Sequence, residues 1–177
     1  MCYELGTGTE IDCKKAFYWY EKSAEQGDQH AICQLGIFYE EGIGCDPDPV
    51  KAVEFYRKAG EMGNSFAVNR LGYCCEEGIG TEKNPALAVD FYKIAAAAGL
   101  ASAQFNLARC YDNAIGTRKN MRLAAKYYML AAEQGDAESQ CNLGVCYENG
   151  TGVEQDSVQA VKWYKLAAAQ DDAIALC

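Results

Sequence analysis

The chain has 177 residues, of which 50% are hydrophobic, and it carries a formal net charge of −9 at pH 7. The apolar content argues against disorder, and the acidic balance argues against a nucleic-acid partner, whose backbone would require clustered Lys and Arg side chains. No apolar run approaches the roughly 20 residues of a membrane-spanning helix, so we expect no membrane insertion.

Residues of the same kind recur every 36 residues along the chain. A period of this size is typical of a solenoid, in which each unit buries its apolar face by stacking on its neighbours. The columns that show it are Ala16, Ala52, Ala88, Ala124 and Ala160; Tyr20, Tyr56, Tyr92, Tyr128 and Tyr164; Gly8, Gly44, Gly80, Gly116 and Gly152; and Leu35, Leu71, Leu107 and Leu143.

Taken in chain order, the elements are a partial repeat over 1–28, whole repeats over 29–64, 65–100, 101–136 and 137–172, and the start of a further helix over 173–177. We expect these to form a single array over residues 1–177. Because the repeat phase places both ends of the chain inside a helix, we also expect the array to be an excerpt of a longer protein.

The unit 29–64 illustrates one repeat. An apolar stripe from Ala31 to Tyr39 has the spacing of an amphipathic helix. The glycines of the turn 42–44 end that helix, since glycine readily adopts the left-handed conformation found past helix ends. A second stripe runs from Ala52 to Ala59, and Gly63 follows it. Each unit is therefore predicted to be helix, turn, helix, turn.

The last whole repeat shows the most complete set of motif residues. They are Gln134-Gly135-Asp136, Leu143-Gly144, Tyr147, Gly150-Thr151-Gly152, Asp156, Ala160, Trp163-Tyr164 and Ala167-Ala168. With these motifs the chain resembles the Sel1-like repeat family, whose repeats are related to tetratricopeptide repeats. The resemblance implies an all-α, right-handed α/α superhelical solenoid of about five 36-residue repeats. Departures from the motif are Cys75, Ala108, Ala114 and Asp171, and they put the local turn geometry in question, chiefly around Ala114.

The residues that could act in catalysis are better explained by structural roles. His30 is the only histidine, and its column holds Phe66, Ser102 and Glu138, as expected of a partly exposed helix position. The adjacent carboxylates Glu40–Glu41 and Glu76–Glu77 are interpreted as a solvated face. We therefore expect no catalytic residues, no metal site and no cofactor.

The ten cysteines include no C-x-x-C pair. We interpret them as reduced side chains that pack like small apolar residues, which favours a reducing, cytoplasmic compartment. Disulfide or metal use by some of them is the alternative.

By resemblance to tetratricopeptide repeats, the first helix of each repeat lines a concave groove. The inward positions vary between repeats while the packing columns do not, as expected of a surface shaped for a peptide or protein ligand. The candidate binding residues are Gln34, Ile37, Asn69, Arg70, Tyr73, Phe105, Asn106, Arg109, Asn142 and Val145.

Two of these candidates are arginines in an otherwise acidic array. Arg70 with Asn106, and Tyr73 with Arg109, can form one patch that holds a carboxylate or phosphoryl group. The alternative is that each Arg pairs with a nearby carboxylate, Glu76, Glu77 or Asp112.

The leading functional hypothesis is a non-enzymatic adaptor or scaffold that binds a protein or peptide. One alternative is a regulatory or targeting segment of a larger multidomain protein. Another, from one branch of the family, is a secreted cysteine-rich binder of β-lactam or cell-wall ligands. We also expect the first repeat to expose Trp19 or Tyr20 and to support self-association through the array ends.

Overall fold

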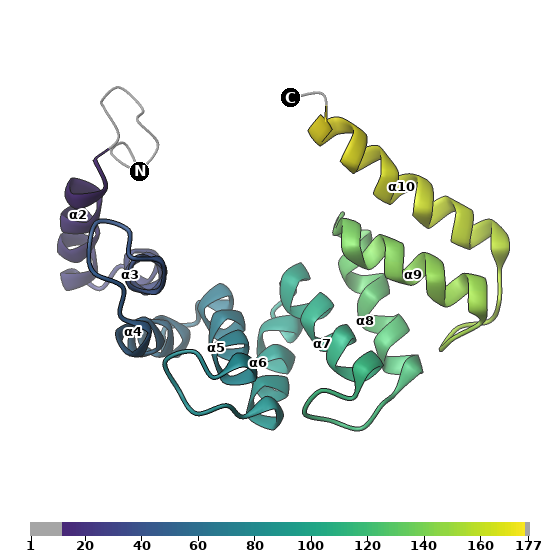
Figure 1. Ribbon diagram of the computed structural model, residues 1–177, viewed down its shortest axis with the longest axis horizontal. Helices are drawn as coiled ribbons and strands as arrows, with labels where there is room; N and C mark the ends of the chain where they lie inside the picture. The colour runs from purple at the N-terminus through teal and green to yellow at the C-terminus, as the bar shows by residue number, and fades with distance from the viewer. Residues whose placement is uncertain (1–11, 176–177) are drawn as a thin grey trace. The chain divides into compact units, whose positions relative to one another are not determined.

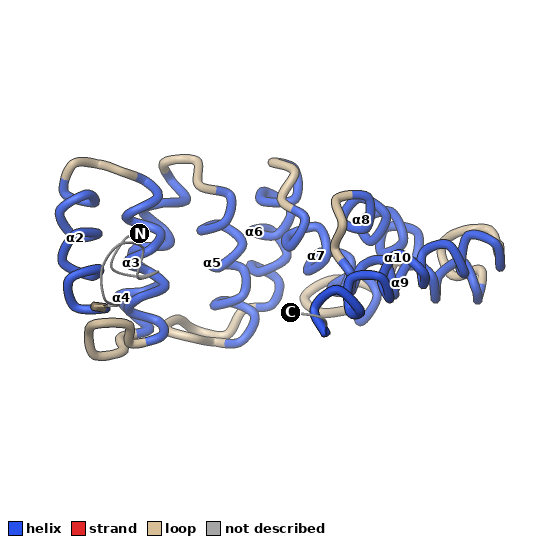
Figure 2. Tube along the Cα trace, turned by 90° about the horizontal axis from the view of Figure 1, so that it is seen from above, coloured by secondary structure: helices blue, strands red, loops and turns tan. Residues whose placement is uncertain are grey.

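The computed structural model describes residues 12–175 of the chain, and side chains as far as residue 170. Gly8, Cys2 and Cys177 lie outside the described residues. Between residues 12 and 175 the chain forms helices joined by turns and contains no strand (Figure 2). The helices, labelled in Figure 1, are α2 (Cys13–Glu25), α3 (Gln29–Glu41), α4 (Pro49–Glu61), α5 (Ser65–Glu77), α6 (Pro85–Ala97), α7 (Ala101–Asn113), α8 (Met121–Glu133), α9 (Ala137–Asn149) and α10 (Ser157–Ala175). The predicted all-α class is confirmed.

The chain divides into two compact units, the first ending at Asn84 and the second beginning at Pro85. In the first unit α3 packs against α4, and α4 against α5. In the second unit α7 packs against α8, α8 against α9, and α9 against α10. Each helix pair is thus formed by neighbours in the sequence, as the repeat pattern predicts.

Polar side chains begin most of the helices. Asp28, Asn64 and Asp136 each accept a hydrogen bond from a backbone N–H in the first turn of the helix that follows. Such caps satisfy donors that the helix itself leaves without partners. α7 follows Leu100, which has no side chain able to cap it.

The turn at Ala114 keeps the geometry of the other repeats. Ala114 has φ of 59°, and its N–H donates to the carbonyl of Cys110, as Gly78 does to Cys74 and Gly150 to Cys146. A left-handed conformation costs alanine roughly 1–2 kcal/mol more than glycine. The turn therefore keeps its conformation and its hydrogen bonds without the glycine.

The predicted new helix at 173 is wrong, because α10 continues without a break to Ala175. In the preceding repeats the chain turns at Gly27, Gly63, Gly99 and Gly135, with φ between 84° and 94°. Asp171 stands in this column, and a residue with a β carbon adopts such a φ only at a cost. The helical conformation therefore runs on past the expected turn.

Tyrosine and glycine set the distance between the two helices of a repeat. The ring of Tyr56 on α4 lies on Gly36 of α3, where a β carbon would be 2.5 Å from the ring atom Cε1. Tyr164 on α10 lies on Gly144 of α9 in the same way. The rings fill the space that the missing side chains leave, which gives the helices their close approach.

Two pairs of glutamines link helices in the second unit. The Nε2 of Gln134 donates to Oε1 of Gln104 at 2.7 Å, and the Nε2 of Gln104 donates to the carbonyl of Ala96 at 3.4 Å. One repeat later, Gln170 donates to Gln140 at 2.9 Å, and Gln140 to the carbonyl of Ala132 at 3.1 Å. Each pair connects the two helices of its own repeat to the backbone of the repeat before it.

We predict that Gly144→Ala lowers the free energy of unfolding by about 1–2 kcal/mol, because overpacking against Tyr164 outweighs the better helix propensity of alanine. Urea unfolding followed by circular dichroism measures the change. In a Tyr164→Ala background the same substitution should stabilise the chain. A loss of stability in both backgrounds would contradict the packing explanation.

Candidate functional site

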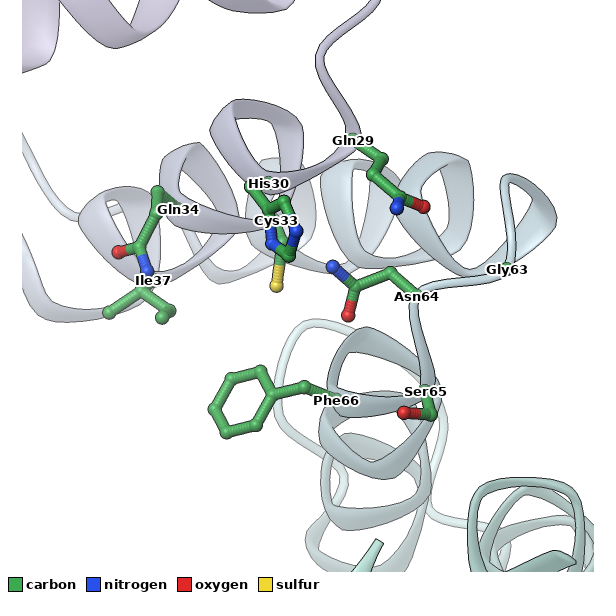
Figure 3. A pocket seen from close by; sticks show the side chains of 9 residues that line it. All are labelled: Gln29, His30, Cys33, Gln34, Ile37, Gly63, Asn64, Ser65 and Phe66. Carbon is green, nitrogen blue, oxygen red and sulfur yellow. The ribbon is translucent and has the colours of Figure 1, made fainter. Parts of the chain in front are cut away.

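We use the term first-helix face for the exposed surface of α3 and α5 in the first unit, and of α7 and α9 in the second. In the first unit this face contains a pocket of about 380 Å³ (Figure 3). Its lining residues are Gln29, His30, Cys33, Gln34 and Ile37 of α3, and Gly63, Asn64, Ser65 and Phe66 at the start of α5. Two of the predicted binding residues, Gln34 and Ile37, therefore lie together at a pocket.

The second unit has a pocket at the corresponding place. It measures about 300 Å³ and is lined by Ala137, Glu138, Cys141, Asn142 and Ala167. The residues 137, 138, 141 and 142 follow 29, 30, 33 and 34 by three periods of 36 residues. The structure thus places the predicted residue Asn142 at the repeat equivalent of Gln34.

The remaining predicted residues differ in exposure. Tyr73 and Val145 are exposed, and Asn106 and Arg109 are half-buried. Asn69 is only 6% exposed, and its part in binding stays a prediction. Phe105 is half-buried and packs against Tyr128 in the core, with ring centroids 6.2 Å apart.

The side chain of Arg70 contacts residues of its own repeat and of the preceding one. Its Nη2 lies 2.5 Å from Oε2 of Glu40 on α3, and its guanidinium carbon lies 5.8 Å and 5.4 Å from the ring centroids of Tyr56 and Tyr73. An ion pair was the predicted alternative for Arg70, and its contact with a ligand stays a prediction. The partner, however, is Glu40 of the preceding repeat and not Glu76 or Glu77. The proposed patch of Arg70, Tyr73, Asn106 and Arg109 has members in both units and stays a prediction.

A recurring hydrogen bond between a tyrosine hydroxyl and a carboxylate was not predicted from the sequence. Three tyrosine hydroxyls donate to a carboxylate 16 residues earlier: Tyr56 to Glu40 at 2.5 Å, Tyr164 to Glu148 at 2.8 Å, and Tyr128 to Asp112 at 3.4 Å. The last bond is the longest, because aspartate is one methylene shorter than glutamate and Ala108 replaces the glycine beneath the ring.

The interpretation of Glu40–Glu41 and Glu76–Glu77 as a solvated face is therefore wrong for the first member of each pair. The Glu40 side chain is 12% exposed and Glu76 is buried, whereas Glu41 and Glu77 are exposed. A signal for these hydrogen bonds is present in the sequence, since an acidic residue recurs every 36 residues, as the tyrosines do.

With the geometry described, comparison with known proteins gives the family. The Sel1 repeat pattern matches residues 1–28, 29–64, 65–100, 101–136 and 137–172. The chain belongs to the Sel1 repeat family. Sel1 repeats typically mediate protein–protein interactions. No curated protein sequence is significantly similar to this chain.

Solved structures similar to the chain include Sel1 repeat proteins. A Sel1 repeat protein of Oxalobacter formigenes shares 34% identity at a TM-score of 0.91, over 96% of this chain and 69% of that protein. A protective antigen of uropathogenic Escherichia coli shares 33% identity at a TM-score of 0.86, over 96% of this chain. This chain spans 36% of the length of the E. coli protein. Cysteine rich protein B of Helicobacter pylori shares 26% identity at a TM-score of 0.56, over 74% of this chain and 96% of that one.

The cysteines of these Sel1 repeats are free in the described part of the chain: Cys13, Cys33, Cys45, Cys74, Cys75, Cys110, Cys141 and Cys146. Burial raises the pKa of the Cys33, Cys74 and Cys146 thiols to about 11. Burial likewise raises the pKa of the Tyr56 hydroxyl, and the hydrogen bond to Glu40 raises it further. All these groups are uncharged at neutral pH.

Within residues 12–175, no three His, Cys, Asp or Glu side chains are grouped so that they could bind a metal ion. None of the described helices has the length and apolar character needed to cross a bilayer.

The first Sel1 repeat exposes one of the two aromatic residues named from the sequence. Trp19 is 57% exposed, while Tyr20 packs against Phe38 with ring centroids 5.2 Å apart. Self-association through this end of the array stays a prediction.

We predict that Arg70→Ala lowers the free energy of unfolding by about 2–4 kcal/mol, because it leaves the Glu40 carboxylate largely buried without its cation. The exposed pair Lys93–Asp90, at 2.9 Å, supplies the control: Lys93→Ala should cost at most about 1 kcal/mol. Adding Glu40→Gln to Arg70→Ala should recover part of the loss in urea unfolding. Equal costs for the Arg70 and Lys93 variants would contradict this account.

We predict that stability falls as the pH rises from about 9 to about 11. The ordinary thiol value is 9.0, so in this interval the unfolded chain releases thiol protons that the folded chain retains at Cys33, Cys74 and Cys146. Below this interval these groups should contribute no pH dependence. Urea unfolding in the presence of a reductant measures the slope. Cys146→Ala should reduce the slope and Cys141→Ala, at an exposed thiol, should not; a slope unchanged by Cys146→Ala would refute the assignment.

Proposed function

We propose that this chain is a non-enzymatic interaction module that binds a protein or peptide partner on the first-helix face of its Sel1 repeats. The observation that carries the proposal is the recurrence of a pocket at the same repeat positions in both units. Each pocket offers a partner a separate point of contact on the first helix of a repeat.

The lining of the two pockets differs although the packing beneath them is repeated. Glu138 stands in the column of His30, and Asn142 in the column of Gln34, while Cys33 and Cys141 are the same residue. Identical architecture with different surface chemistry supports a face that discriminates between ligand groups, because specificity comes from a few placed polar groups.

Exposed apolar side chains also lie on this face. Tyr73 and Val145 occupy the same column as Ile37, and both are exposed. A partner that covers them removes apolar surface from water and gains a favourable contribution to binding.

The neighbourhood of the single histidine supports a binding role over nucleophilic catalysis. His30 and Cys33 line the same pocket, but burial raises the pKa of the thiol to about 11. A thiolate is therefore not supplied at neutral pH, and the pair lacks the activated nucleophile of a Cys–His enzyme.

We predict that a face variant carrying Gln34→Ala, Tyr73→Ala, Asn142→Ala and Val145→Ala loses about tenfold or more of its affinity for a partner captured from a lysate of the source organism. The matched control carries Ile94→Ala and Val158→Ala, two exposed apolar residues of the second helices. It should retain the partner. Equal retention by both variants, each folded by circular dichroism, would refute the first-helix face as the binding surface.

A further inference from the structure

The second unit has a further pocket, of about 780 Å³, beside the loop between α9 and α10. Residues of α8, of the loop at 153–156 and of α10 line it, together with Tyr147 near the end of α9. We infer that it binds a lysine side chain of a peptide or protein partner, with the ammonium group on the ring of Tyr147 and beside the carboxylate of Asp156. The inference goes beyond the proposed function, because this pocket shares no residue with the two pockets of the first-helix face.

The repeat 29–64 shows how an ammonium group occupies the corresponding position. The Nζ atom of Lys51 lies 5.1 Å from the ring centroid of Tyr39 and 3.4 Å from Oδ2 of Asp48. Lys51 therefore interacts at once with the face of an aromatic ring and with a carboxylate, and both groups attract a cation. In this repeat a lysine of the chain itself fills the position.

The pocket has the ring and the carboxylate but lacks the lysine. Tyr147 and Asp156 follow the tyrosine and the aspartate of that contact by three periods of 36 residues, and both line the pocket. The residue three periods after Lys51 is Gln159, an uncharged side chain that also lines the pocket. The position that Lys51 fills in its own repeat is thus available to a lysine from a partner.

The two aspartates use their oxygens in the same way, except for the missing ammonium group. Oδ1 of Asp48 accepts a hydrogen bond from the backbone N–H of Lys51 at 3.1 Å, and Oδ2 meets the Nζ of the same lysine. Oδ1 of Asp156 accepts from the backbone N–H of Gln159 at 3.0 Å. Its Oδ2 has no hydrogen-bond or ion-pair partner within the described part of the chain. The cap of α10 therefore leaves one carboxylate oxygen for a ligand.

Two further carboxylates add negative charge to the pocket. Glu133 and Glu154 line it, and among the described residues neither forms an ion pair. Glu25, three periods before Glu133, pairs with Lys22 at 2.9 Å, and Leu130 stands at the position of that lysine. A second lysine that neutralises a carboxylate in the first unit is thus absent here.

The charge of the whole lining favours a cation. Lys162 is the one basic residue among those that line the pocket, and its Nζ lies 5.2 Å from the ring centroid of Trp163. Against it stand the carboxylates of Glu133, Glu154 and Asp156, so the lining keeps two unbalanced negative charges. A carboxylate ligand would be repelled at this pocket, whereas an ammonium group is attracted.

Apolar and aromatic side chains provide a surface for the rest of the lysine. Met129, Tyr147 and Val153 are partly buried against the core that contains Trp163. The methylene stem of a lysine can lie along such a surface while its ammonium group meets the carboxylates. Trp163 is 8% exposed, and its Nε1–H has no acceptor among the described residues. A peptide carbonyl that reached this N–H would supply one, which favours a peptide over a simple amine.

The direct test titrates N-acetyl-lysinamide into the ¹⁵N-labelled full chain and follows the NMR shifts. We expect saturable changes at the amides of Tyr147, Asp156 and Gln159, with a dissociation constant on the order of millimolar. The amides of Asp48 and Lys51 should not change, because their repeat already contains its lysine. The same probe acetylated on its side-chain nitrogen has no charge, and it should bind at least about fivefold more weakly.

Gln159→Lys tests the position by giving the last repeat a lysine of its own. This variant should stay folded, since Lys51 is accommodated at the equivalent place, and it should weaken N-acetyl-lysinamide binding at least about tenfold. The matched control is Val158→Lys, which adds the same charge at a residue that is 77% exposed and does not line the pocket. At physiological salt the control should bind within about twofold of the parent chain.

Pentylamine distinguishes a lysine in a peptide from a free amine. It has an ammonium group and an alkyl stem but no carbonyl. It should therefore bind at least about fivefold more weakly than N-acetyl-lysinamide and leave the indole N–H signal of Trp163 unchanged.

Equal binding of the acetylated probe, unchanged binding in Gln159→Lys, an equal loss in Val158→Lys, or no saturable shift at this pocket would overturn the inference. Equal binding of pentylamine would overturn the assignment to a peptide. Because the pocket lies outside the first-helix face, none of these results changes the test of the proposed function with the four-residue face variant.

Discussion

The contact between a tyrosine of the second helix and a glycine and carboxylate of the first is the interaction on which the repeats 29–64 and 137–172 depend. In the repeat 29–64, the ring of Tyr56 lies on Gly36 and its hydroxyl donates to Glu40. Gly36 and Glu40 are four residues apart and so share one side of α3. At roughly 100° per residue, Gln34 projects from the side turned away from that contact, and His30 and Ile37 project from the flank beside it. The tyrosine thus determines which residues of the first helix reach the surface and form the pocket.

The same contact explains why the largely buried carboxylate of Glu40 is tolerated. A carboxylate removed from water requires hydrogen bonds or a cation. Glu40 has both, from Tyr56 and from Arg70, while Glu148 has the hydroxyl of Tyr164. Arg70 also joins two repeats, because its carboxylate partner lies on α3 and the arginine itself on α5. The residue that the sequence suggested as a ligand contact therefore stabilises the stacking of the two repeats.

Much of the fold followed from periodicity, because the columns of Ala, Tyr, Leu and Gly each have one geometric role in every unit. The residues Gln34, Ile37 and Asn142, which line the pockets, followed from the resemblance to tetratricopeptide repeats. Asn64 and Phe66 were missed, since they lie at a helix start, where the pattern indicates a cap and a surface position and not a pocket wall. The hydrogen bond to Glu40 was missed because exposure of a carboxylate depends on a hydroxyl 16 residues away. The continuation of α10 was missed because Asp171 stands where the other repeats have glycine. The turn at this position needs a positive φ, which glycine adopts more readily than aspartate.

The glutamine pairs of the second unit have a consequence for how such an array can grow. Gln104 with Gln134, and Gln140 with Gln170, are bonded within one repeat, and the outward bond goes to a main-chain carbonyl. In the repeat 29–64 the same two positions hold Ile32 and Met62, so both glutamines are replaced together. A carbonyl is supplied by any preceding neighbour whatever its sequence. A gene duplication that copies 101–136 or 137–172 would therefore carry a complete polar unit to its new place. The ion pair of Arg70 with Glu40 has the opposite effect, because it joins side chains of two different repeats. A duplication that copied only one of these repeats would separate the arginine from its carboxylate.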